Sequence, residues 1–427
     1  MSRTQPSPEL VLEPDGLTPY LRRLFLLVSV ATLFEGFDTL LTSLALPYLA
    51  KEFEADSEAM GRAVGLIGVG TVLAFAPVRL ADRFGRRPML LTAVVGYTAF
   101  SVASAFSQRL SHFITLQLLA RMFMVTEIGL AFVILSEEMP ARMRGRANAS
   151  LMAFAGIGGI LAALAFQHVI DSPLGWRGLY LLSGLLLPLL PIYWWQIRET
   201  RRWNERMTKA PPTSVLHELR RTRIVFHHEY RRSTYVGTIL WLTVNLWTGS
   251  AVFWFNYYAV NERGWSPDLI ATVLPVASVI GFVGYFATGP LMDFVGRRFT
   301  ASLYLGLGGL ATIMCFTSHT TWVIAACYIV FMALQAVWSV AGTITSELFP
   351  TSVRATGNAV TNNLLGRFGM VVAGFAVGTI SSHWLGSVGN AVAFLSILNF
   401  LCLPVLMFLL PETRGRALEE IASSPYD

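Results

Sequence analysis

The pattern of Asp82-Arg83-Phe84-Gly85-Arg86-Arg87, an aspartate followed by Gly-Arg-Arg, occurs twice in this chain. It returns as Asp293-Phe294-Val295-Gly296-Arg297-Arg298, 211 positions later. Two further motifs repeat at almost the same offset. Ser136-Glu137-x-x-Pro140-x-x-x-Arg144 returns as Ser346-Glu347-x-x-Pro350-x-x-x-Arg354 after 210 positions, and Glu199-Thr200-Arg201 returns as Glu412-Thr413-Arg414 after 213. Three matches at nearly one spacing predict two halves of like architecture arranged in parallel.

Composition indicates the medium that surrounds these halves. Of the 427 residues, 54% are hydrophobic and only 14% are charged, and the mean hydropathy is +0.55. A soluble domain usually carries about 25% charged residues. A chain of this size would form two or three soluble domains, yet no polar stretch is present to cover their cores. The surplus apolar surface therefore predicts an integral membrane protein.

Apolar runs occur at the length that a bilayer requires. A helix needs roughly 20 apolar residues to cross a hydrocarbon core of about 30 Å, and its backbone must satisfy its own hydrogen bonds in lipid. We expect six spans near 24–47, 60–80, 89–107, 111–136, 147–170 and 177–197, and six near 234–260, 268–291, 300–317, 321–346, 357–381 and 387–410.

The predicted fold class is an all-α membrane protein with twelve transmembrane helices in two parallel, pseudo-symmetric six-helix bundles. Residues 1–197 would form the first bundle and residues 234–427 the second, with a basic cytoplasmic linker over 198–233.

Basic residues gather on one side of the predicted spans. That side holds Arg83, Arg86, Arg87, Arg142, Arg144, Arg146, Arg297, Arg298, Arg354, Arg414 and Arg416, besides the linker. The other side holds little beyond Lys51, Arg62, Arg109, Arg177 and Arg263. The positive-inside rule then places both termini in the cytoplasm. The net charge of +6 reflects this bias and does not indicate nucleic-acid binding. We expect a monomeric, multi-pass protein of a cell membrane, and the short outer loops suit a bacterial inner membrane.

Catalytic and metal-binding patterns do not emerge from the sequence. Cys315, Cys327 and Cys402 all lie inside apolar runs, where a free cysteine behaves as a small hydrophobe. Gly156-Ile157-Gly158-Gly159 favours close helix approach and lacks the context of a phosphate loop. We therefore expect no cofactor, no metal and no enzymatic activity.

The chain resembles a member of the major facilitator superfamily over nearly its whole length. Residues 80–87 are similar to the loop signature of that superfamily, with Val78 where a glycine is usual. Ser346-Glu347-Leu348-Phe349-Pro350 with Arg354, and Pro411-Glu412-Thr413-Arg414-Gly415, are similar to signatures of its sugar-porter branch. The resemblance is specific for fold and weak for substrate.

The repeated charged motifs predict a cytoplasmic gate. Acidic and basic residues at inner helix ends can pair between the halves when that side is closed, and they must separate in each cycle. The candidate gate residues are Asp82, Arg86, Glu137, Arg144, Asp293, Arg297, Glu347 and Arg354. Such pairs would govern rate rather than specificity. The alternative is that these charges only fix topology.

Ionisable side chains inside the apolar runs form the candidate site. A charge at the bilayer centre costs about 2.5–3.5 kcal/mol on insertion scales, so each one needs a compensating role. Glu35 and Asp38 lie in the first span at a spacing that puts both on one helical face. Arg121 lies in the fourth span and Arg367 in the eleventh. Glu127, six residues from Arg121 on a different face, is left out of the site.

The segment Glu35-Gly36-Phe37-Asp38 resembles the aromatic-acid/proton symporters and related metabolite porters of the superfamily, which typically have aspartate at the position of Glu35. Arg367 within Gly366-Arg367-Phe368-Gly369 is similar to that family as well. The superfamily arrangement implies that spans 1, 4, 7 and 10 line a cavity, with 2, 5, 8 and 11 close behind. Further candidates for substrate binding are Asn245, Gln335 and Trp338.

These charges suggest a coupling chemistry. A carboxyl group in a low-dielectric cavity favours its neutral form, whereas a nearby arginine opposes this unless a substrate anion competes for that arginine. Proton and substrate binding then favour one another. Our hypothesis is that Asp38, alone or with Glu35, carries the proton, and that Arg121 or Arg367 holds a substrate carboxylate. The alternative is a permanent ion pair between Arg121 and one of the two carboxylates.

The leading functional prediction is proton-coupled symport of a small organic anion, aromatic or heterocyclic, by alternating access. The partners would be that small molecule, a proton and the lipid bilayer, with no nucleic acid. Sugar or polyol uptake is one alternative, although Val244-Asn245-Leu246-Trp247-Thr248-Gly249 lacks the paired glutamines usual in sugar porters. Efflux of amphipathic cations and a non-transporting nutrient sensor are the others.

Overall fold

The structure is a computed structural model that describes residues 18–140, 143–209, 222–350 and 353–412. Within these ranges every regular element is a helix. Eleven of the described helices are long and apolar enough to cross a membrane. The remaining expected span, near 89–107, is helix α4 (Arg86–Ser104), whose 19 residues begin with two arginines. The all-α prediction is confirmed.

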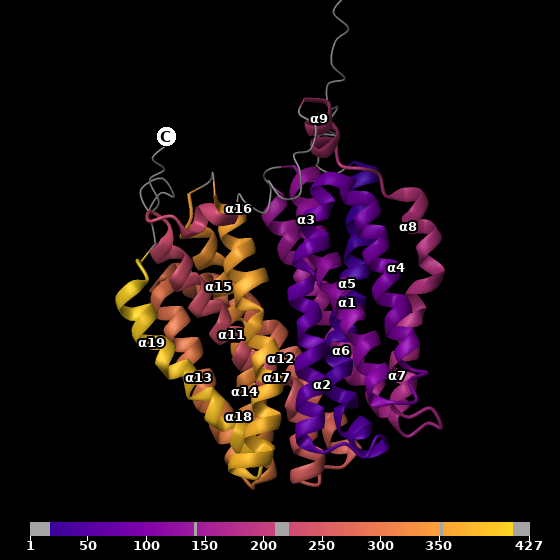
Figure 1. Ribbon diagram of the computed structural model, residues 1–427, viewed down its shortest axis with the longest axis vertical. Coiled ribbons are helices and arrows are strands. Elements are labelled where there is room, and N and C mark those ends of the chain that lie inside the picture. Colours follow the sequence, from indigo (N-terminus) through magenta and orange to yellow (C-terminus); the bar gives the residue numbers. More distant parts are fainter. Residues whose placement is uncertain (1–17, 141–142, 210–221, 351–352, 413–427) are drawn as a thin grey trace, which may run out of the picture.

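The helices form two bundles that lie side by side, the first indigo to magenta and the second rose to yellow (Figure 1). The first bundle contains α1 (Pro19–Glu52), α2 (Ser57–Leu73), α3 (Phe75–Phe84), α4, α5 (Leu110–Glu138), α6 (Arg144–Ile170), α7 (Trp176–Leu182), η1 (Ser183–Leu189) and α8 (Leu190–Gln196). The second contains α11 (Arg231–Tyr257), η3 (Tyr258–Glu262), α12 (Pro267–Val295), α13 (Arg297–Thr317), α14 (Thr321–Leu334), α15 (Val337–Glu347), α16 (Arg354–Asn358), η4 (Ala359–Gly366), α17 (Phe368–Ile380), η5 (Ser381–Leu385), α18 (Val388–Ser396) and α19 (Leu398–Leu409). Between them lie α9 (Arg201–Lys209) and η2 (Thr222–Phe226).

Local sequence signals explain where several helices begin. Asp56 caps α2 by accepting a hydrogen bond of 2.7 Å from the backbone N–H of Ala59. Ser266 caps α12 in the same way, ahead of Pro267, whose missing N–H is harmless at the first helical position. The observed helices overlap all twelve expected spans and differ from them by a few residues at their ends.

The repeated motifs form the same contact in each half, which we call a clamp: a glutamate carboxylate accepts hydrogen bonds from the backbone N–H groups at the start of a helix. Gly85 adopts a φ of 107°, which turns the chain so that the backbone N–H groups of Arg86 and Arg87 face the carboxylate of Glu199 at 2.9 and 3.2 Å. A Cβ on Gly85 would lie 2.3 Å from that carboxylate, so only glycine fits. The carboxylate thus sits at the N-terminus of α4, where helix N–H groups need acceptors.

The second half reproduces this clamp. Gly296 has a φ of 96°, and Glu412 accepts from the N–H groups of Arg297 and Arg298 at 3.0 and 3.2 Å. The end of the sixth helix of each half is therefore tied to the start of the third. We call the end of the bundles that carries these clamps and α9 the basic end, and the other the distal end.

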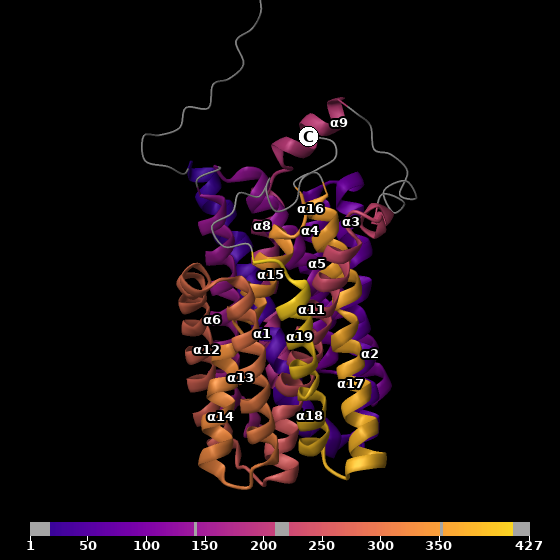
Figure 2. The same ribbon diagram turned by 90° about the vertical axis from the view of Figure 1, so that its left-hand side faces the viewer.

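Three helix pairs join the halves. The pairs α2–α17 and α6–α12 lie at opposite edges of the molecule in Figure 2, and α1 packs against α11. Glycines allow the first of these contacts. A Cβ added to Gly61 would lie 2.5 Å from the Cα of Gly378, and one added to Gly374 would lie 2.3 Å from the nitrogen of Gly65. Such close backbone approach is typical of helix packing in membranes.

Polar contacts also join the halves toward the distal end. The hydroxyls of Ser57 and Ser382 lie 3.0 Å apart, and the ring of His383 lies 3.1 Å from the carboxylate of Glu58. The ribbons of the two bundles, by contrast, draw apart toward the basic end (Figure 1). The structure thus holds the halves together at the distal end.

Candidate functional site

The two acidic residues of α1 have different surroundings. Asp38 is 5% exposed and accepts hydrogen bonds from Ser183 of η1 and Ser101 of α4, so it faces the interior of the first bundle. Glu35 is half-buried, and its carboxylate accepts a hydrogen bond of 3.3 Å from the hydroxyl of Thr39. Asp38 therefore has the environment of a structural acceptor, whereas Glu35 has a single neutral donor among the described residues.

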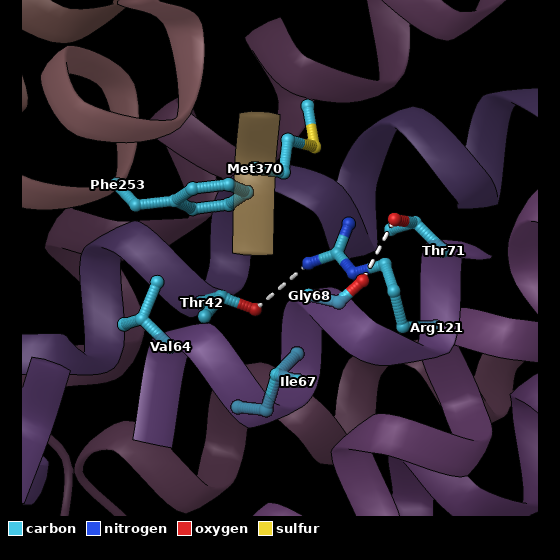
Figure 3. Close-up of a pocket in the computed structure, with 8 residues that line it drawn as sticks. All are labelled: Thr42, Val64, Ile67, Gly68, Thr71, Arg121, Phe253 and Met370. Carbon is cyan, nitrogen blue, oxygen red and sulfur yellow. Dashed lines mark hydrogen bonds between the residues drawn. The ribbon is translucent and has the colours of Figure 1, made fainter. Parts of the chain in front are cut away.

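Arg121 of α5 lies against the same turn of α1. Its guanidinium donates to the hydroxyls of Thr39 and Thr42 at 3.3 and 3.2 Å, and Figure 3 shows it beside the ring of Phe253, which comes from the other bundle. The guanidinium carbon lies 5.6 Å from the centre of that ring. The Thr39 hydroxyl accepts from Arg121 and donates to Glu35, so it links the two charges in place of a direct ion pair.

Arg367 approaches from the second bundle. It follows the π-helix η4, a type of distortion that is frequent at functional sites. Its guanidinium carbon lies 5.3 Å from the ring of Trp338, and its buried Nε has no hydrogen-bond partner among the described residues. The charges of Arg121 and Arg367 both act on Glu35 and on one another. Two guanidinium groups from opposite halves therefore exert their charge on one carboxylate.

The remaining predicted binding residues divide into two groups. Trp338 donates to the hydroxyl of Thr248 at 3.1 Å, and Thr248 donates to Gln335 at 2.8 Å, so these three form one polar chain beside Arg367. Asn245 is fully buried and donates to the carbonyl of Trp241, with Gly369 packed against its Cβ. The structure thus places Asn245 in the contact between α11 and α17.

A small cavity adjoins Arg121 between the two bundles. It is lined by Thr42, Val64, Ile67, Gly68, Thr71, Arg121, Phe253 and Met370 (Figure 3). Its volume is about 10 Å³, which is the room that one water molecule requires. An aromatic substrate would need the Arg121 and Phe253 side chains to move apart at this point.

A second cavity opens at the distal end, directly beyond the first. It has a volume of about 420 Å³, and its lining includes Tyr48, Lys51, Tyr257 and Trp265. Ser43 and Asn256 lie between the two cavities along α1 and α11, and their side chains are fully buried. A layer about one helical turn thick therefore separates the Arg121 cavity from the distal end.

Six of the eight predicted gate residues form ion pairs within their own half in the described part of the chain. Arg86 bonds Asp82 and Glu137 at 2.8 and 3.1 Å, and Arg297 bonds Asp293 and Glu347 at 3.1 and 3.3 Å. Arg354 donates to the carbonyl of Phe349. Arg144 begins α6, but its side chain lies outside the described residues. Each half therefore carries its own copy of a three-residue charge cluster.

Sequence reasoning missed several residues that the structure brings to the site. Thr39, Thr42, Phe253 and Met370 touch or line it. The spacing of Glu35, Thr39 and Thr42 along one face of α1 was a visible signal for the two threonines. Phe253 and Met370 come from the second half, and no spacing rule connects them to Arg121.

Two six-helix bundles that enclose charged side chains at mid-depth define a membrane transporter rather than an enzyme. A sequence model described as the Major Facilitator Superfamily matches residues 28–374. The protein belongs to this superfamily, as the repeated motifs predict.

Similar proteins support the same assignment. The chain is 26% identical to the niacin transporter NiaP of Acinetobacter baylyi, over 92% of this chain and 94% of that one. It is 25% identical to the 4-hydroxybenzoate transporter PcaK of Pseudomonas aeruginosa, over 92% of each chain. Among solved structures, a D-xylose-proton symporter matches with a TM-score of 0.75 at 18% identity, over 93% of this chain and 100% of that one. The two-bundle fold is thereby confirmed.

Proposed function

We propose that this protein carries a small aromatic or heterocyclic carboxylate across the membrane together with a proton. The observation that carries the proposal is the link from Glu35 through the Thr39 hydroxyl to Arg121, together with the charge of Arg367, which also acts on Glu35. Relatives named as transporters of niacin and of 4-hydroxybenzoate support this substrate class.

The site suits such an anion in its charge and in the aromatic rings that flank that charge. A guanidinium group binds a carboxylate through two parallel hydrogen bonds and never loses its proton. The rings of Phe253 and Trp338 lie beside the two guanidinium groups, at 5.6 and 5.3 Å, so an aromatic substrate would contact both charge and ring. We infer that its carboxylate binds Arg121, Arg367 or both.

Proton uptake by Glu35 then follows from the competition between its carboxylate and that of the substrate for these arginines. While the site is empty, burial favours the neutral form of Glu35, and the two positive charges oppose this by favouring its ionised form. A substrate carboxylate that neutralises them removes this stabilisation, so Glu35 takes up a proton. The proton also offsets the charge of the anion, which would otherwise cost about 2.3 kcal/mol per 100 mV to bring into a negative interior. The enclosed position of Asp38 leaves Glu35 as the better candidate for this proton.

The distribution of basic residues also predicts how the protein is oriented in the membrane. We propose that the basic end and both termini face the cytoplasm, following the positive-inside rule. Because the halves contact one another at the distal end, the structure then corresponds to a state that is sealed toward the outside. The gate ion pairs would be rearranged when the basic end closes. The units proposed for this motion are residues 1–197 and 234–427, with 198–233 as the linker of a monomeric transporter.

One observation favours a second candidate, which is a neutral hydroxylated substrate. The side-chain amide nitrogen of Gln335 is buried without a hydrogen-bond partner in the described part of the chain. A buried donor of this kind suits a sugar or polyol hydroxyl.

Uptake into proteoliposomes under an imposed pH gradient tests the proposal. We expect radiolabelled nicotinate or 4-hydroxybenzoate to accumulate only when the inside is alkaline, and a protonophore to abolish the accumulation. Protein-free liposomes correct for passive entry of the neutral acids. Xylose accumulation with no response to either acid would overturn the proposal and favour the second candidate.

A further inference from the structure

Glu127, a buried carboxyl group beside the proposed site, has no role in the coupling proposed for Glu35. Glu127 of α5 is 0% exposed. One of its oxygens accepts a hydrogen bond of 3.3 Å from the hydroxyl of Thr32 in α1, and the other has no hydrogen-bond partner among the described residues. No lysine, arginine or histidine in the described part of the chain forms an ion pair with it. A carboxyl group so placed is strongly favoured in its neutral form.

The groups around Glu127 do not supply the missing positive charge. The titratable groups that act on it are Glu35 of α1, Tyr97 of α4 and Tyr193 of α8, and all of these are acids. Both tyrosine hydroxyls already donate elsewhere, Tyr97 to the carbonyl of Ala31 at 3.1 Å and Tyr193 to that of Leu27 at 2.5 Å. Neither is available to stabilise an ionised Glu127.

A line of polar side chains connects Glu127 with the proposed site. Ser29, Thr32, Glu35, Thr39 and Thr42 follow one another at spacings of three or four residues, so they share one face of α1. Thr42 and Thr39 contact Arg121, whereas Thr32 contacts Glu127 about two turns closer to the start of the helix. Ser29 is fully buried, and its hydroxyl has no partner among the described residues.

This line runs from the Arg121 cavity toward the basic end. Helix α1 begins at that end, where the ring of Tyr20 lies beside the guanidinium of Arg198. A proton that leaves Glu35 in this direction therefore meets the Thr32 hydroxyl and Glu127 first.

We propose that Glu127 is a second proton-binding site, which passes protons between Glu35 and the basic end. The inference rests on the proposed proton-coupled function. Glu127 gives its proton to water that enters from the basic end, and the proton of Glu35 then replaces it, so one proton leaves and no other reactant is needed. Because the two carboxyl groups act on one another, ionising both at once is unfavourable, and the pair keeps at least one proton throughout.

The variant Glu127→Gln tests this inference, because glutamine keeps the size and the acceptor for Thr32 but carries no exchangeable acid. In proteoliposomes we expect substrate exchange at equal pH to stay within about twofold of the parent, while uptake driven by a pH gradient falls by about tenfold or more. Thr32→Val, which removes the hydroxyl between the two acids, should lower gradient-driven uptake less. Glu138→Gln, at the end of the same helix, is the matched control and should change neither measurement.

Infrared difference spectroscopy gives a readout that does not depend on transport. The parent protein should show the carbonyl band of a buried, protonated carboxylic acid, and Glu127→Gln should lack it. Unchanged gradient-driven uptake in Glu127→Gln, or an unchanged band, would overturn the inference. If this variant does not assemble, normal gradient-driven uptake in Thr32→Val would overturn it equally. Absence of gradient-driven uptake in the parent protein would instead refute the proposed function itself.

Discussion

The side-chain amide of Asn256 in α11 donates a hydrogen bond of 2.9 Å to the hydroxyl of Ser43 in α1, and so connects the two halves beside the Arg121 cavity. Ser43 in turn donates to the backbone carbonyl of Val252 at 2.6 Å. Both side chains are fully buried. These two bonds lie in the layer that separates the Arg121 cavity from the distal cavity.

Replacing Asn256 with leucine should weaken this layer. The lost hydrogen bond is worth about 1 kcal/mol, which shifts the equilibrium between conformations about fivefold toward the state open at the distal end. The measurement is the rate at which a membrane-impermeant thiol reagent, added outside, labels a cysteine at Ile67. The three native cysteines are replaced by serine in this background. Ser396→Ala, which removes a hydroxyl bonded within its own helix, should leave the rate unchanged. Equal rates in both variants would rule out the sealing role.

Gly61→Ala should oppose closure of the distal end. Its new Cβ would lie 2.5 Å from the Cα of Gly378, so the two backbones must separate. Overpacking of this kind costs about 1–3 kcal/mol, which predicts faster outside labelling of the same cysteine at Ile67 and slower transport. Gly289→Ala is the matched control, because nothing lies within 4 Å of its added Cβ. Normal transport and labelling in Gly61→Ala would show that the α2–α17 contact does not depend on glycine.

Glu35→Gln should separate proton coupling from substrate movement. Without an acid at this position, gradient-driven uptake should fall by about a hundredfold, while exchange of labelled for unlabelled substrate continues. Asp38→Asn keeps an acceptor for Ser183, so we expect it to lose less than about tenfold in the same assay. The opposite order of the two variants would make Asp38 the proton carrier, as the sequence alone favours.

Arg121→Lys should weaken substrate binding while the protein still folds. Lysine retains the charge but cannot hold a carboxylate through two parallel bonds or reach Thr39 and Thr42 together. We expect the KM for the aromatic acid to rise about tenfold, as measured by initial uptake rates. Arg62→Lys, at an exposed ion pair with Glu58, serves as the control and should leave the KM unchanged. An unchanged KM in Arg121→Lys would transfer the anion-binding role to Arg367.

Glu199→Gln should destabilise the first half. The variant replaces a charged acceptor of two backbone N–H groups with a neutral one, which costs about 1–3 kcal/mol. Thermal unfolding in detergent should show a lower midpoint, and Glu412→Gln should lower it comparably because the second clamp has the same geometry. Glu205→Gln, on the exposed surface of α9, should have no effect. A midpoint unchanged in both clamp variants would contradict the role assigned to the repeated motifs.

The fold was predictable because its signals are local. Run length alone indicates each membrane helix, and the recurrence of 82–87 as 293–298 indicates the duplication. The positive φ of Gly85 and Gly296 was not read from the sequence, nor was the reason that Glu199 and Glu412 accompany them. That reason is a contact between helix ends more than a hundred residues apart, which no spacing rule reveals.

The site was predictable only in part. The acids in α1 and the arginines in α5 and η4–α17 stand out because charge is rare in apolar runs. A helical period gives the angle of a side chain around its own helix but not the neighbour that it meets. Glu127 was set aside because it points away from Arg121 along α5, yet α1 runs past both residues and contacts each of them. The gate pairs depend on which end of the transporter is closed, and a sequence does not specify that state.

The Glu199 clamp also has a consequence for how the chain is made. Its carboxylate follows Arg86 and Arg87 by 113 and 112 positions, so the contact cannot form until the last helix of the first half has left the ribosome. Until then the two N–H groups at the N-terminus of α4 lack this acceptor and depend on water instead. The order of synthesis therefore allows this contact to form before the second half is translated. A chain truncated before Glu199 would lack this contact and leave the start of α4 without its carboxylate acceptor.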